Sequence, residues 1–179
     1  EKIDAGEKLN AEETLEFEHV RARFDGICKL SHEKDVQVLI DAEHSWIQNV
    51  LDDLVREMMQ KYNKEKTIVF HTYQLYRHDK LASLKADYYF AETEGFYLGA
   101  KLVRGAYMEI ERERAAEKGY PSPIQPNKEA TDQAYNDAML FCLEHLDRVS
   151  FMAGTHNEKS SRILAEAMHK KNVAPTHDH

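Results

Sequence analysis

Four short polar segments of the sequence contain residue types that could do chemistry. Each one follows or continues a short apolar run of the kind that forms a buried strand. Functional side chains gather at the carboxyl ends of the strands in parallel α/β folds, so these segments are expected to meet at one edge of a sheet. Because loop ends are ordinarily polar, a solvated loop is the alternative interpretation of each segment. The segments are Asp41-Ala-Glu43-His44, His71-Thr-Tyr-Gln74, Lys101-Leu-Val-Arg-Gly-Ala-Tyr107 and Thr155-His-Asn157.

The acids and histidines at these positions raise the questions of an acid–base pair and of a metal site. Asp41 and Glu43 are two residues apart, so in extended backbone they point to the same side, as an acid–base pair would. An acid at a strand end also commonly caps the next helix, and both interpretations stay open. The chain has ten histidines, but their spacing predicts no metal site, and the close pair His177 and His179 lies at the terminus. The alternating acids and bases of residues 111–118 predict a solvated helix face.

Composition narrows the function classes. A chain of 179 residues with 42% hydrophobic residues is long enough for one folded domain with a sizeable core. The net charge of −8 argues against binding to nucleic acid or to an anionic membrane surface. No apolar run approaches the roughly 18 residues of a membrane helix, and no signal or transit sequence is recognisable. Cys28 and Cys142 lack metal-ligand spacing and are expected to be buried free thiols in a reducing compartment.

Apolar runs alternate with helical patterns along the chain. This alternation predicts a parallel sheet covered by helices, with strands adjacent in chain order. Periodicity alone does not separate a doubly wound sheet from a (β/α)8 barrel, but no Gly-rich phosphate fingerprint follows any strand. We therefore expect a parallel (β/α)8 TIM-type barrel, of which residues 1–179 form a single partial domain with about four strands. The predicted strands are 36–40, 67–70, 97–103 and 149–153, and the predicted helices are 10–32, 47–58, 79–94, 107–118, 127–146 and 158–171. A capping box at Asn10, a C′ glycine at Gly95 and a cap at Asn157 are the predicted helix ends. The apolar stripe predicted for the first helix is Phe17, Val20, Phe24 and Ile27.

Taken together and in this order, the four segments resemble the flavin-dependent proline dehydrogenase barrel. The resemblance is closest to the mitochondrial, single-function branch of that family and covers about residues 10–179. Its most specific part is the heptapeptide 101–107 followed by Glu111-Arg112, and Pro123-Ile-Gln-Pro126 and Glu129-Ala-Thr131 extend it.

The resemblance implies a distorted (β/α)8 barrel that holds FAD at the carboxyl ends of its strands. It implies oxidation of L-proline to Δ1-pyrroline-5-carboxylate, with hydride transfer to flavin N5 and electrons passed on to quinone. It also implies a parent protein that lies on the matrix side of the mitochondrial inner membrane and is associated with that membrane.

The same resemblance assigns roles to individual residues. Lys101 is expected beside the flavin N5 edge, where a cation stabilises the charge of the reduced ring. Asp41 is expected to orient the site, and Tyr107 to form a wall for the substrate ring. Gly105 and Ala106 are expected to let the backbone approach the flavin. The expected flavin-binding residues are Lys101, Val103, Gly105, Ala106, Thr155, His156, Asn157 and His71.

Three parts of the family site have no counterpart in the sequence: an early-strand lysine, a later substrate tyrosine and a C-terminal helix with an arginine pair. We therefore expect the chain by itself to be inactive and to retain FAD poorly. Two alternatives remain open, namely a 4-hydroxyproline dehydrogenase and a catalytically silent truncated fragment that acts only as an interaction module.

Overall fold

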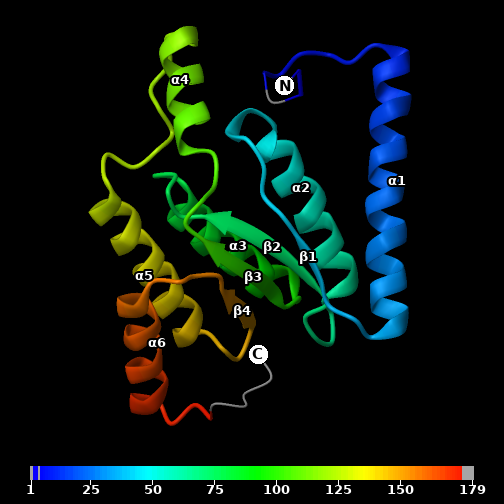
Figure 1. The fold of residues 1–179 in the computed structure, drawn as a ribbon. Coiled ribbons are helices and arrows are strands. Elements are labelled where there is room, and N and C mark those ends of the chain that lie inside the picture. Colours follow the sequence, from blue (N-terminus) through cyan, green and yellow to red (C-terminus); the bar gives the residue numbers. More distant parts are fainter. Residues whose placement is uncertain (1, 4, 175–179) are drawn as a thin grey trace.

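The computed structural model describes residues 2–3 and 5–174. A parallel four-stranded sheet in the order β1-β2-β3-β4 lies at its centre, and helices follow each strand in turn (Figure 1). The strands are β1 (Val38–Ile40), β2 (Val69–Gln74), β3 (Leu98–Val103) and β4 (Val149–Ala153). The helices are α1 (Ala11–Lys34), α2 (Ser45–Tyr62), α3 (Lys80–Glu94), α4 (Met108–Lys118), α5 (Lys128–Glu144) and α6 (Glu158–Lys170).

The parallel, chain-order sheet confirms the predicted fold class. All three neighbouring strand pairs run parallel, and a central row pairs Thr72 of β2 with Lys101 of β3 and Lys101 with Met152 of β4. Because a strand followed by a helix and a parallel strand turns in one hand, three such units in chain order curve toward a barrel. The arrangement is that of the four-stranded portion of a (β/α) barrel.

Strands β1 and β2 differ from the prediction by two residues or more at their boundaries. Strand β2 covers 69–74 rather than 67–70, because its residues up to Gln74 are buried and pair with β3. Strand β1 starts at Val38 rather than at residue 36. Asp35 adopts a left-handed conformation (φ 56°) that ends α1, and the amide of Val36 still bonds back to the carbonyl of Ser31.

Three helix-end predictions are confirmed, and one buried stripe is not. Asn10 starts α1 in a capping box, Gly95 ends α3 in the left-handed region, and Asn157 caps α6 through its side chain. On α1 the expected apolar stripe included Ile27, whose side chain is exposed, whereas Cys28 beside it is buried. The helix packs against α2, and the other three residues of the predicted stripe, Phe17, Val20 and Phe24, are half-buried.

The core lies between the sheet and helices α2, α3 and α5, which pack against β2, β3 and β4. Strand residues alternate between two faces, and Tyr73, Ala100 and Leu102 belong to this core. Cys28 and Cys142 are both free and buried, as predicted. No helix in the described part of the chain combines the length and apolar character required to cross a membrane.

Candidate functional site

A pocket of about 880 Å³ lies at the carboxyl ends of the four strands. It brings together every predicted site residue except His71. Since these residues come from segments more than 100 positions apart in sequence, the parallel sheet is what assembles the site. The pocket is lined by Asp41, Ala42, Glu43, Thr72, Gln74, Lys101, Val103, Arg104, Gly105, Ala106, Tyr107, Lys128, Gly154, Thr155, His156 and Asn157.

Lys101 and Asp41 form an ion pair on the floor of the pocket. Lys101 lies beside Thr72 in the sheet, and Asp41 follows the last paired residue of β1, so the lysine reaches across the β2 strand. The Lys101 side chain is 25% exposed, whereas that of Asp41 is 71% exposed. The amine is therefore held in the pocket while its carboxylate partner stays largely in water.

Tyr107 closes one side of the pocket at the start of α4. Its Oη lies 3.4 Å from Oε2 of Glu43, and its ring centroid lies 4.4 Å from that of His44. The negative charge of Glu43, followed by burial and the contact with Glu43, raises the pKa of the Tyr107 phenol. The hydroxyl therefore stays protonated and serves as a donor to Glu43.

Gly105 is required for a reason other than the predicted one. Its φ is 135°, a backbone conformation that residues other than glycine rarely adopt. A Cβ at this position would lie 2.4 Å from Cδ1 of Tyr76. The missing side chain makes room for this tyrosine ring. The backbone of Gly105 and Ala106 is nevertheless exposed and lines the pocket.

Arg104 holds the Thr155–Asn157 segment in place, a role that sequence reasoning missed. Its guanidinium donates to Oγ1 of Thr155 (2.8 Å), to Oγ of Ser160 (2.9 Å) and to Asp132 (2.6 Å). It also lies 4.3 Å from the ring centroid of Tyr135. The arginine thus joins the end of β3 to α5 and α6.

The three residues of this segment present different groups to the pocket. Thr155 Oγ1 also accepts a hydrogen bond from the Asn157 amide (3.0 Å), and the Asn157 side chain accepts one from the Ser160 amide (3.1 Å). Both side chains therefore have partners within the protein. His156 is exposed in the pocket and is the member of the segment whose side chain is available to a ligand.

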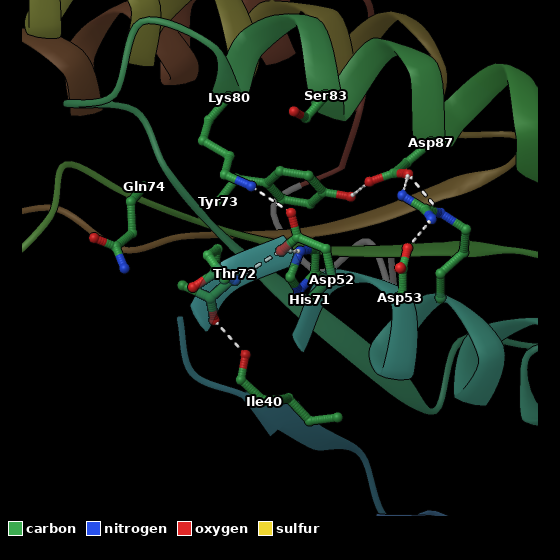
Figure 2. Close-up of polar contacts among 12 residues, drawn as sticks. Ile40, Asp52, Asp53, His71, Thr72, Tyr73, Gln74, Lys80, Ser83 and Asp87 are labelled. Atoms are coloured by element: carbon green, nitrogen blue, oxygen red, sulfur yellow. Dashed lines mark hydrogen bonds and ion pairs between the residues drawn. The ribbon is translucent and has the colours of Figure 1, made fainter. Parts of the chain in front are cut away.

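The predicted pocket position of His71 is wrong. The His71 side chain is only 1% exposed and lies on the helix-facing side of β2, with Nε2 2.9 Å from Oδ1 of Asp52 (Figure 2). Its two neighbours in the alternation, Thr72 and Gln74, line the pocket instead. Alternation along β2 puts His71 on the face opposite Thr72 and Gln74, and the register of β2 with Lys101 and Val103 of β3 shows which face lines the pocket.

Gln74 is therefore the amide that β2 offers to the pocket. Its Nε2 donates to the carbonyl oxygen of Glu43 at 2.9 Å. Its Oε1 is buried, and within residues 2–3 and 5–174 no donor reaches it. A buried acceptor without a donor is costly, so this oxygen marks a place for a ligand N–H.

Glu111 corrects the prediction of a solvated helix face at 111–118. Its side chain is fully buried, and its carboxylate accepts hydrogen bonds from the Ser45 amide (2.7 Å) and the Ser45 hydroxyl (2.5 Å). The N-cap residue His44 makes no capping bond through its own side chain. Glu111 therefore caps α2 from α4 and ties both helices to the pocket rim.

The described residues contain no group of three or more histidine, cysteine, aspartate or glutamate side chains that could hold a metal ion. The pair His177 and His179 considered from sequence lies outside the described residues.

Comparison with known proteins identifies the relatives of the chain. The model of the family described as "Proline dehydrogenase" matches residues 2–177. "Proline dehydrogenase 1, mitochondrial" of Drosophila melanogaster is 36% identical over 89% of this chain and 25% of its own length. The human protein of the same name is 37% identical over 96% of this chain and 29% of its own length.

A second group of relatives and a solved structure extend the comparison. "Hydroxyproline dehydrogenase" of Bos taurus is 32% identical over 98% of this chain and 41% of its own length. The crystal structure of proline utilization A (PutA) from Bdellovibrio bacteriovorus, inactivated by N-propargylglycine, superposes with a TM-score of 0.82. It is 23% identical and covers 88% of this chain and 16% of the PutA chain, so it supports the fold. The chain thus spans about a quarter to two fifths of the length of these curated relatives.

Proposed function

The chain belongs to the proline dehydrogenase family, and we propose that it forms the central portion of the catalytic barrel of an enzyme that oxidises L-proline to Δ1-pyrroline-5-carboxylate. In this proposal residues 1–179 are one partial domain, with FAD as cofactor and quinone as the electron acceptor. The mitochondrial relatives support a mitochondrial location, which we assign to the matrix side of the inner membrane.

One observation carries the proposal: Lys101 and Gln74 line the same pocket at the strand ends, and the amide oxygen of Gln74 is buried without a donor among the described residues. An oxidised flavin ring carries one N–H between two carbonyl oxygens, which is the kind of donor that this oxygen lacks. The residues that would hold FAD are Gln74, Lys101, Val103, Gly105, Ala106, Thr155, His156 and Asn157.

Bound FAD would supply the hydride acceptor. The protein side chains then have separable tasks. Lys101 keeps a positive charge at the pocket floor, where it stabilises negative charge that develops during the oxidation. Asp41 fixes the position of this amine through their ion pair. The Tyr107 ring provides an apolar wall for the carbons of the substrate, and its hydroxyl is held by Glu43.

The hydroxyproline dehydrogenases among the relatives favour 4-hydroxyproline as the second candidate substrate. An extra hydroxyl is distinguished well only by a site that offers it a hydrogen-bond partner. The substrate preference is therefore tested by comparing L-proline directly with 4-hydroxyproline.

The test is anaerobic reduction of the intact protein purified with its flavin. We expect L-proline to bleach the oxidised-flavin absorption band faster than trans-4-hydroxy-L-proline, while dithionite reduces the same flavin irrespective of substrate. Protein that carries no flavin, or flavin that dithionite bleaches and neither amino acid does, would contradict the proposal.

A further inference from the structure

Behind the pocket, on the helix-facing side of β2, lies a buried charged cluster that the proposed chemistry does not use. Figure 2 shows Lys80 of α3, Asp52 of α2 and His71 of β2 converging there. Lys80 is only 2% exposed and is ion-paired with Oδ2 of Asp52, and Oδ1 of Asp52 lies 2.9 Å from His71. Burial by itself would raise the pKa of Asp52, but His71 and Lys80 outweigh it and hold this pKa well below its usual range. Asp52 is therefore a fixed, charged acceptor.

Gln48 connects this cluster to the pocket. It is 1% exposed, its Nε2 donates to Oδ1 of Asp52 at 2.7 Å, and its Oε1 accepts from the amide of Glu43 at 2.8 Å. A carboxylate can only accept hydrogen bonds, so the amide nitrogen must face Asp52 and the amide oxygen must face Glu43. The charge of Asp52 thus selects the one orientation of Gln48 that can hold the Glu43 N–H.

The Glu43 backbone is held on both sides. Gln48 accepts from its amide, and Gln74 donates to its carbonyl oxygen at 2.9 Å. Residues 41–44, between β1 and α2, have no regular secondary structure that could fix them otherwise. Residues of this short segment make two contacts with pocket residues, namely the ion pair of Asp41 with Lys101 and the contact of Glu43 with Tyr107.

We propose that Gln48, anchored by Asp52 and Lys80, is a positioning residue that fixes residues 41–44 and thereby sets where the Lys101 amine and the Tyr107 hydroxyl lie. A buried ion pair is poor evidence for added stability, because desolvation offsets its attraction. Its value here is directional, since it keeps a charged acceptor at one place beside Gln48. The inference deepens the proposed function, and the placement of the segment can be measured without turnover.

The experiment compares Gln48→Met with Gln60→Met in the intact protein. Both glutamines lie on α2, but Gln60 is in the last turn, away from residues 41–44, and donates to Glu94, so its loss serves as the matched control. Hydrogen exchange followed by mass spectrometry reports amide protection in a peptide that spans residues 41–44. We expect Gln48→Met to lower protection there by about tenfold or more, because the Glu43 N–H loses its acceptor, while the centre of α2 keeps its protection. Gln60→Met should change neither.

A paired exchange tests the directional claim. Asp52→Asn alone replaces a carboxylate, which only accepts, with an amide that can also donate, so it no longer fixes the orientation of Gln48 and should also loosen residues 41–44. Adding Gln48→Glu to Asp52→Asn restores a matched donor and acceptor between the two positions and keeps an oxygen toward the Glu43 amide, so protection should return. This variant also decides the matter if Gln48→Met does not fold.

Three results would overturn the inference. They are unchanged exchange at residues 41–44 in Gln48→Met, an equal loss along the whole chain, and a paired exchange that restores nothing. Hydrogen exchange requires neither turnover nor substrate, so these results are separate from a failure of proline oxidation.

Discussion

Replacing Lys101 with methionine removes one charge from the pocket and keeps the aliphatic stem. The structure separates the two free energies involved. Asp41, the partner of Lys101, is 71% exposed and remains hydrated without it, so the lost ion pair costs the fold about 0–1 kcal/mol. A positioned donor or cation at a site of developing negative charge lowers the activation free energy by about 3–4 kcal/mol. We therefore expect Lys101→Met to fold as the parent does and to reduce its flavin with proline about 100-fold to 1,000-fold more slowly.

The assay is anaerobic stopped-flow reduction together with the flavin reduction potential. That potential should fall, since the reduced form loses a positive neighbour, and a shift of about 30 mV corresponds to a tenfold change in a two-electron couple. Lys61→Met is the matched control, because Lys61 pairs with Asp25 on the surface between α1 and α2. If Lys101→Met keeps a rate within about twofold of the parent and an unchanged potential, the lysine is structural and the reasoning is refuted.

Three further changes give expected outcomes. Asp41→Ala should lower turnover more than flavin content, measured as the flavin-to-protein ratio, because Asp41 orients the pocket amine; full turnover with lost flavin would contradict this. Glu111→Gln should lower the unfolding free energy by about 1–3 kcal/mol in denaturant titration, since a buried cap loses an acceptor, whereas exposed Glu109→Gln should not. Gly105→Ala should lower the melting temperature more than Gly119→Ala does, because both have positive φ but only Gly105 has a tyrosine ring in the way; equal shifts would argue against the clash.

Much of the fold was predictable from the sequence because its apolar runs and caps act locally. The capping box at Asn10 and the left-handed end at Gly95 depend on residues within a few positions of each other. Parallel pairing in chain order follows from the alternation of strands and helices. Local patterns could not show where β2 ends. His71 and Tyr73, in its polar half, are held by partners on α2 and α3.

Site residues were predictable where the position along a strand fixes the direction of the side chain. Predictions were wrong where the partner of a residue lies far away in sequence. Lys101 and Val103 share one face of β3, and the same alternation places Gln74, not His71, in the pocket. Glu111 looked like part of a solvated face because its partner, Ser45, is 66 residues away. No pattern within a single helix identifies a carboxylate that caps another helix.

The orphaned Gln74 oxygen was also beyond sequence reasoning, because burial and the lack of a donor are properties of the folded pocket. Arg104 could have been suspected from its place at the end of β3, but its partners on α5 and α6 become neighbours only after folding.

The central claim is that this pocket holds the flavin of a proline dehydrogenase. The most direct measurement is a crystal structure of the intact protein purified with its flavin. The account predicts the flavin ring at the strand ends, with an N–H within hydrogen-bond distance of Gln74 Oε1 and the Lys101 amine against the ring. A flavin bound elsewhere, or a ring in the pocket that leaves both groups without contact, would contradict it.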